Sequence, residues 1–151
     1  MERRTFLKGI ATTAALLTAN KAEAVFSGVP SGAYRESYKS LTNHGNPSGM
    51  EKKHVPGIKS PLSIKAEEWF EVTVNVGFMS EHPTTSKHWI TMILLLSDGV
   101  EIARTEYKAG GTTASSATFK IKLEKSATIE AIEDCNLHGT WISEPVKITV
   151  S

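Results

Sequence analysis

The chain has 151 residues, of which 40% are hydrophobic and 22% are charged, and its formal net charge is +1 at pH 7. This length suits one domain with a buried core and leaves little room for a second. The near-neutral charge excludes a protein that holds nucleic acid through a broad basic surface. With one cysteine, Cys135, the chain has no internal disulfide.

The first 24 residues have the features of an export signal. Arg3 and Arg4 lie in a charged start, an apolar stretch covers residues 9–19, and a small-residue cleavage site follows at residues 22–24. The apolar stretch is shorter than the ~20 residues that span a bilayer. The paired arginines resemble the twin-arginine export signal, with an ordinary secretory signal as the alternative. We therefore expect a signal peptide over residues 1–24 and a periplasmic protein without a membrane span after its removal.

Residues 25–50 are interpreted as an N-terminal arm. They are rich in Gly, Ser, Pro and Asn, and only residues 34–41 show a weak helical pattern. The domain itself is expected over residues 51–151.

The sequence of this domain predicts a series of short strands. Phe70, Val72, Val74 and Val76 alternate with polar residues, which is typical of a half-buried strand. Asp98-Gly99 is a strong hairpin-turn signal between two further strands. The expected strands cover residues 70–76, 89–96, 100–107, 119–123, 127–132 and 146–150. About seven short strands without a long helix predict an all-β, immunoglobulin-like β-sandwich.

Four histidines and the cysteine flank these strands. His54 precedes the first of them, His82 and His88 bracket a loop before residues 89–96, and Cys135 and His138 follow residues 127–132. Loops at strand ends are where a rigid sandwich can bring ligands together.

The chemistry of these side chains favours a transition metal. Imidazole suits iron, copper, nickel and zinc, and a thiolate donates electrons to the metal. Four nitrogens and one sulfur exceed the tetrahedral shell of structural zinc and suit a five-coordinate iron with one open position. Taken singly, a loop histidine is more often solvated and a buried cysteine is often a small hydrophobic residue. His44 belongs to no such pattern and is interpreted as solvated.

Three segments resemble the iron-site motifs of the superoxide reductases, the family of the neelaredoxins and of the iron domain of desulfoferrodoxin. They are Lys53-His54-Val55-Pro56, His82-Pro83 with His88-Trp89-Ile90, and Cys135-Asn136-Leu137-His138-Gly139-Thr140-Trp141. Their order and spacing are far more specific than any one motif. Because the chain has one cysteine, the four-cysteine domain of desulfoferrodoxins is missing from it, and the resemblance is to the one-iron class.

The resemblance implies one iron, Fe(2+)/Fe(3+), with His54, His82, His88 and His138 in a plane and Cys135 on the axis. It implies one-electron reduction of superoxide to hydrogen peroxide at the open position. The electron would come from a small donor protein, rubredoxin-like or a cytochrome, and family members often form homo-oligomers.

The residues just before His54 also bear on what the resemblance implies. Lys53 matches the lysine of the family motif, which would attract superoxide and assist protonation, although a solvated lysine is the plain alternative. The family usually has a glutamate two residues before this histidine, where this chain has Lys52. Glu51 lies one residue further away. We therefore expect ligation of the oxidised iron by glutamate to be weakened or lost.

Two other functions remain open at this point. A non-catalytic module that carries a metal or a sulfur compound could use a similar sandwich, but would not need four histidines and a thiolate. A blue-copper electron carrier uses two histidines and a cysteine, which would leave two histidines unexplained.

Overall fold

The structure, a computed structural model, describes residues 34–151. The expected signal peptide and residues 25–33 of the expected arm lie outside the described residues. Within the described part, no helix is long and apolar enough to cross a membrane.

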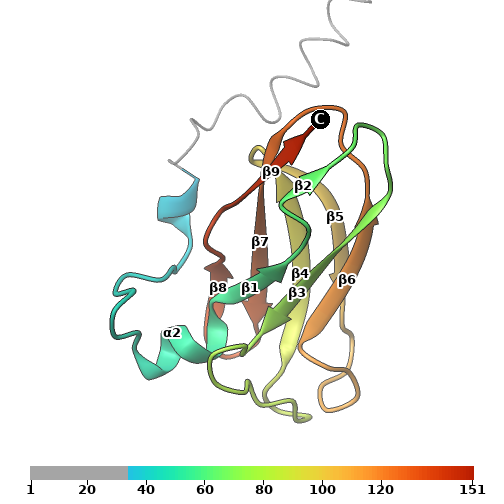
Figure 1. Ribbon diagram of the computed structural model, residues 1–151. Helices are drawn as coiled ribbons and strands as arrows, with labels where there is room; N and C mark the ends of the chain where they lie inside the picture. The colour runs from blue at the N-terminus through green and yellow to red at the C-terminus, as the bar shows by residue number, and fades with distance from the viewer. Residues whose placement is uncertain (1–33) are drawn as a thin grey trace, which may run out of the picture. The chain divides into compact units, whose positions relative to one another are not determined.

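Strands are the main regular elements of the described chain (Figure 1). Two short helices come first, the 3-10 helix η1 (Arg35–Ser37) and the α-helix α2 (Gly49–His54). The strands are β1 (Pro56–Lys59), β2 (Ser63–Ile64), β3 (Phe70–Val76), β4 (Ile90–Ser97), β5 (Val100–Glu106), β6 (Ser116–Ile121), β7 (Ala127–Cys135), β8 (Gly139–Ile142) and β9 (Val146–Val150).

The strands form two sheets. One has the order β1-β3-β6, and the other has the order β2-β9-β7-β4-β5 with β8 paired to β7. Apart from the parallel pair β2–β9, the paired strands run antiparallel. The two sheets make a sandwich, which confirms the predicted all-β fold.

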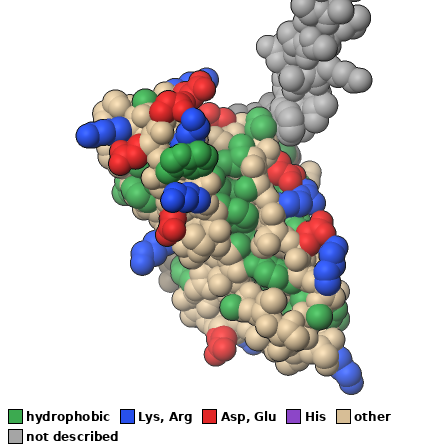
Figure 2. All heavy atoms as spheres, turned by 90° about the vertical axis from the view of Figure 1, so that its right-hand side faces the viewer, with side chains coloured by type: hydrophobic (Ala, Val, Ile, Leu, Met, Phe, Trp, Pro, Cys, Tyr) green, Lys and Arg blue, Asp and Glu red, His purple; other side chains and the backbone are tan. Residues whose placement is uncertain are grey.

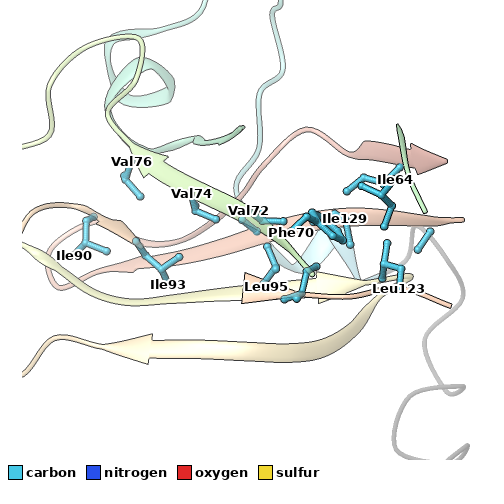
Figure 3. Close-up of a cluster of buried hydrophobic side chains, with 14 of the residues drawn as sticks. Ile64, Phe70, Val72, Val74, Val76, Ile90, Ile93, Leu95, Leu123 and Ile129 are labelled. Carbon is cyan, nitrogen blue, oxygen red and sulfur yellow. The ribbon is translucent and has the colours of Figure 1, made fainter. Parts of the chain in front are cut away.

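The core lies between the sheets. The alternating residues of β3 point inwards from one sheet and face residues of β4 and β7 in the other, as Figure 3 shows for Val72, Val74, Ile93 and Leu95. All four of these side chains are fully buried. The alternation read from the sequence therefore identifies the inner face of β3 correctly.

The sequence prediction was incomplete before residue 70 and after Cys135. The helix suggested for residues 34–41 was too long. Only Arg35–Ser37 form a helical turn, and Lys39 forms an isolated β-bridge with Trp141 of β8. The helix α2 and the strands β1, β2 and β8 were not predicted. The three strands have two to four residues each, which is too short for an alternating pattern to stand out.

The outer face of the larger sheet also carries a small apolar cluster. Leu94, Leu96, Ile132 and Ile142 are buried there, and Tyr34 and Tyr38 from the start of the described chain pack against them. On the face shown in Figure 2, side chains of both charges are interspersed with small apolar patches, and no histidine of the described residues is visible. Four of the five histidines gather elsewhere, at one end of the sandwich.

Candidate metal centre

Three segments that are far apart in the sequence meet at one end of the sandwich. His54 is the last residue of α2, His82 and His88 lie in the loop between β3 and β4, Cys135 ends β7, and His138 lies in the turn between β7 and β8. The structure thus brings together all five residues that the sequence suggested as ligands.

The four imidazoles form a closed ring. Neighbouring ring centroids are 4.7 to 4.9 Å apart, in the order His54, His82, His88, His138, and adjacent planes are inclined by 70° to 83°. His54 and His88 face each other across the ring at 6.4 Å, with planes inclined by 28°. This arrangement, with neighbours crossed and opposite rings nearly parallel, resembles the equatorial plane of a metal complex.

The donor atoms of the ring converge on its centre. Candidate ligand atoms of His54, His82, His88 and Cys135 all lie within 4.8 Å of one another. His138 belongs to the same cluster, because its Nδ1 lies 3.1 Å from His54 Nε2 and 3.6 Å from Cys135 Sγ.

Two of these nitrogens show that the centre fits a metal ion. Nε2 of His82 and Nε2 of His88 are buried and have no hydrogen-bond partner among residues 34–151. A buried polar nitrogen without a partner is costly, whereas a lone pair that faces a cation is satisfied. Imidazole and thiolate donors together suit a transition metal rather than calcium or magnesium.

Backbone carbonyls orient two of the imidazoles. His54 Nδ1 lies 2.8 Å from the carbonyl oxygen of Met50, and His82 Nδ1 lies 2.7 Å from that of Pro83. A proton on each Nδ1 leaves Nε2 free to bind the metal. Burial also lowers the pKa of His54 and brings the pKa of His82 to about 4, so both rings are neutral at pH 7.

Asn136 connects the two loops that carry ligands. Its side-chain oxygen accepts a hydrogen bond from the backbone N–H of Trp89 at 2.9 Å, and its amide nitrogen donates to the carbonyl of Lys87 at 2.9 Å. Both contacts flank His88. Sequence reasoning assigned no role to Asn136, although it lies within the Cys135–His138 motif.

Cys135 is almost fully buried, with 2% of its surface exposed. Burial raises the pKa of its thiol, and hydrogen bonds from the backbone of Leu137 and His138 act in the opposite direction. A bound cation would lower this pKa much further, because a coordinating thiol loses its proton.

Lys53 and Glu51 have different positions relative to the centre. Lys53 is exposed at the end of α2, and its charge is close enough to lower the pKa of His88, after the larger effects of burial and His138. Glu51 instead accepts hydrogen bonds from Ser48 and Thr42, and these bonds lower its pKa to about 2. It forms a capping box with Ser48 at the start of α2.

The remaining histidine, His44, lies outside the ring. Its side chain is exposed, as expected, and its Nε2 lies 3.1 Å from a carboxylate oxygen of Glu144.

One further ionisable side chain, Glu133, is buried close to Cys135 in the sequence. Glu133, two residues before Cys135, is fully buried, and neither of its carboxyl oxygens has a hydrogen-bond partner within the described part of the chain. Burial raises its pKa to about 9, so it is protonated at neutral pH.

The fold and this centre define the class: a β-sandwich metalloprotein with a mononuclear site of four histidines and one cysteine. The chain belongs to the desulfoferrodoxin family, whose model matches residues 46–144.

Individual relatives agree with this assignment. Desulfoferrodoxin from Nitratidesulfovibrio vulgaris is 38% identical over 104 residues, which is 69% of this chain and 71% of the relative. Superoxide reductase from Pyrococcus furiosus is 31% identical over 110 residues, which is 62% of this chain and 86% of the relative. The solved structure of a superoxide reductase (neelaredoxin) from Ignicoccus hospitalis is similar with a TM-score of 0.65 and 31% sequence identity. The superposition covers 77% of this chain and 97% of the neelaredoxin chain.

Proposed function

We propose that this protein is a superoxide reductase that holds one iron ion per chain within the four-imidazole ring. The observation that carries the proposal is the ring itself, with the Cys135 sulfur beside it. The donor set suits iron, and the matching family includes named superoxide reductases. The reaction joins one superoxide anion, one electron and two protons to give one hydrogen peroxide.

Iron bound in this centre would supply the electron that superoxide accepts. The residues of the chain do the rest. The ion would be held by four imidazoles and one thiolate, those of His54, His82, His88, His138 and Cys135. This set of five donors would leave one coordination position for a small anion, and the thiolate would favour loss of the electron.

Lys53 is proposed to attract and orient superoxide. Its ammonium group lies at the exposed end of α2, and its charge acts on His88. A positive charge near the open position raises the local concentration of an anionic substrate and can organise the water that delivers protons.

The electron donor and the location of the protein are also proposals. A small redox protein is needed to return an electron after each turnover, and a rubredoxin-like protein or a cytochrome would serve. Export to the periplasm by the twin-arginine route is supported by Arg3 and Arg4 and by the small-residue site at residues 22–24.

The deciding experiment is the metal content and oxidised visible spectrum of the protein after anaerobic loading with ferrous iron. We expect one iron per chain and a thiolate-to-iron charge-transfer band that disappears in Cys135→Ser. Superoxide consumption should match hydrogen peroxide formation one to one. Iron binding without that band, or copper binding in preference to iron, would contradict the proposal and favour a carrier or copper protein.

A further inference from the structure

The segment over residues 34–42, here named the N-terminal strap, precedes the region that matches the family model. It lies along the larger sheet, because Lys39 N donates to the carbonyl of Thr140 at 3.2 Å and Ile142 N donates to the carbonyl of Lys39 at 2.9 Å. Arg35 anchors its start through an ion pair with the buried Glu130 and a 3.0 Å hydrogen bond to the carbonyl of Ser143.

The strap contacts the turn that carries Cys135 and His138. Lys39 Nζ donates a 2.8 Å hydrogen bond to the carbonyl oxygen of His138, which also accepts a 3.3 Å hydrogen bond from Trp141 Nε1. The same ammonium lies 5.4 Å from the centroid of the Trp141 ring, which in turn stacks on His54. Lys39 therefore touches the segment of one ligand and the packing partner of another.

The strap also fixes the helix that carries His54. Both the backbone N–H and the hydroxyl of Thr42 donate to one oxygen of Glu51 at 2.7 Å, and Ser48 N donates to the other at 2.6 Å. Glu51 is 6% exposed, and three hydrogen bonds hold its carboxylate at the start of α2. One turn later this helix ends at His54, whose ring Nδ1 bonds the carbonyl of Met50.

We propose that Lys39 and the Thr42–Glu51 pair are positioning residues, through which the strap sets the relative places of His54 and His138. These two ligands are 84 residues apart in sequence, yet their ring nitrogens are 3.1 Å apart. The inference also assigns Glu51 to the helix cap rather than to the metal. It rests on the proposed metal centre, but not on the reaction that the centre performs.

The test compares Thr42→Val and Lys39→Met with wild type in the full chain. Cobalt(II) is the probe, because its binding and its spectrum report the ligand geometry without superoxide chemistry. Removal of a group that orients a ligand typically weakens metal binding by about 10–100-fold. We expect at least a tenfold loss of cobalt affinity and a shifted cobalt–thiolate band in both variants. Thr42→Ser, which keeps the hydroxyl, should behave like wild type.

Matched controls separate positioning from general destabilisation. Thr118→Val removes a hydroxyl that makes a 3.0 Å bond to Thr73 on the outside of the smaller sheet, and Lys120→Met removes an exposed lysine of the same strand, β6. Both should leave cobalt affinity unchanged.

The inference is overturned if Thr42→Val and Lys39→Met lower the melting temperature but keep wild-type cobalt affinity and spectrum. Thr42→Val retains the backbone hydrogen bond to Glu51, so it should remain folded even if Lys39→Met does not. A wild-type protein that binds cobalt normally but does not reduce superoxide would refute the proposed function and leave this inference to be judged on cobalt alone.

Discussion

Trp141 stacks on His54, with ring centroids 5.1 Å apart and planes inclined by 18°. The indole is 5% exposed, so it packs the ligand against β8 and shields one side of it from water. Flat contact with a large ring restricts rotation of the imidazole, which helps to keep its nitrogen aimed at the metal.

Trp141→Ala should therefore destabilise the metal-free protein by about 3–5 kcal/mol and also weaken metal binding. Trp141→Phe, which keeps an aromatic face, should lose less of both. Urea unfolding and metal titration measure the two effects. Trp69→Ala is the control, because that indole is 60% exposed. If Trp69→Ala and Trp141→Ala lose stability and metal affinity equally, the stacking of Trp141 on His54 does not have the role proposed here.

Gly110 allows the loop between β5 and β6 to support the loop that carries His88. A Cβ at this position would lie 2.2 Å from the carbonyl oxygen of Thr85 and 2.6 Å from the Trp89 ring. Backbone must therefore move in Gly110→Ala, at a cost of roughly 1–3 kcal/mol, and His88 should move with it. Thermal unfolding and the charge-transfer band would report these changes.

Gly45→Ala provides the comparison for this variant, since its new Cβ would meet only the Asn43 side chain at 3.7 Å. We expect wild-type stability and spectrum there. If Gly110→Ala also leaves both unchanged, the two loops are not mechanically connected.

Lys53→Ala should slow superoxide reduction about tenfold at low ionic strength and should weaken its dependence on salt. The reason is the loss of the exposed positive charge that is proposed to attract superoxide. The charge-transfer band should stay in place, because Lys53 is not a ligand. Pulse radiolysis at several salt concentrations measures the effect. Lys120→Ala, on the distant strand β6, should leave the rate of superoxide reduction and its salt dependence unchanged. If Lys53→Ala also leaves both unchanged, the proposed role of Lys53 is excluded.

Much of the fold follows from patterns in the sequence. The alternation from Phe70 to Val76 predicted β3 within its observed bounds. The apolar run before Asp98-Gly99 predicted the central strand β4, and Asp98 adopts the positive φ of 49° that this hairpin turn uses. The five candidate ligands were proposed from their motifs, and the structure places them close together.

The surroundings of the ligands were harder to predict. The Ser48–Glu51 spacing is a capping-box signal that was available in the sequence and predicts the helix α2. The contacts of Lys39 with His138 and of Asn136 with Trp89 leave no such signal, because they join segments far apart in the chain. Only tertiary packing brings these groups together.

Glu133→Met should stabilise the metal-free protein by about 1–3 kcal/mol at pH 7. Both carboxyl oxygens are buried and have no partner among the residues that the structure describes, and an unbranched apolar side chain of similar size removes this unfavourable burial. Urea unfolding measures the difference. Glu71→Met, at an exposed position of β3, should change stability little. A destabilised Glu133→Met protein would indicate a hydrogen-bond partner for this carboxyl group.

Glu51 should make the stability of the metal-free protein depend on acid. Hydrogen bonds from Thr42 and Ser48 lower its pKa from 4.5 to about 2 in the folded chain. The charged carboxylate therefore stabilises the fold fully above pH 4.5, and this contribution decreases as the pH falls towards 2. Glu51→Gln should accordingly be less stable than wild type at pH 7, and the difference in stability should narrow as the pH falls from 4.5 towards about 2.

Urea unfolding of both metal-free proteins across this range tests the expectation, and Glu68→Gln, at an exposed position, serves as the control. Metal is removed for this measurement because acid also protonates the histidine ligands and would add a second pH dependence. A gap that stays constant with pH would mean that the charge of Glu51 does not contribute to capping α2. Three hydrogen bonds hold this carboxylate at the start of α2, whereas His54 lies at the other end of the same helix.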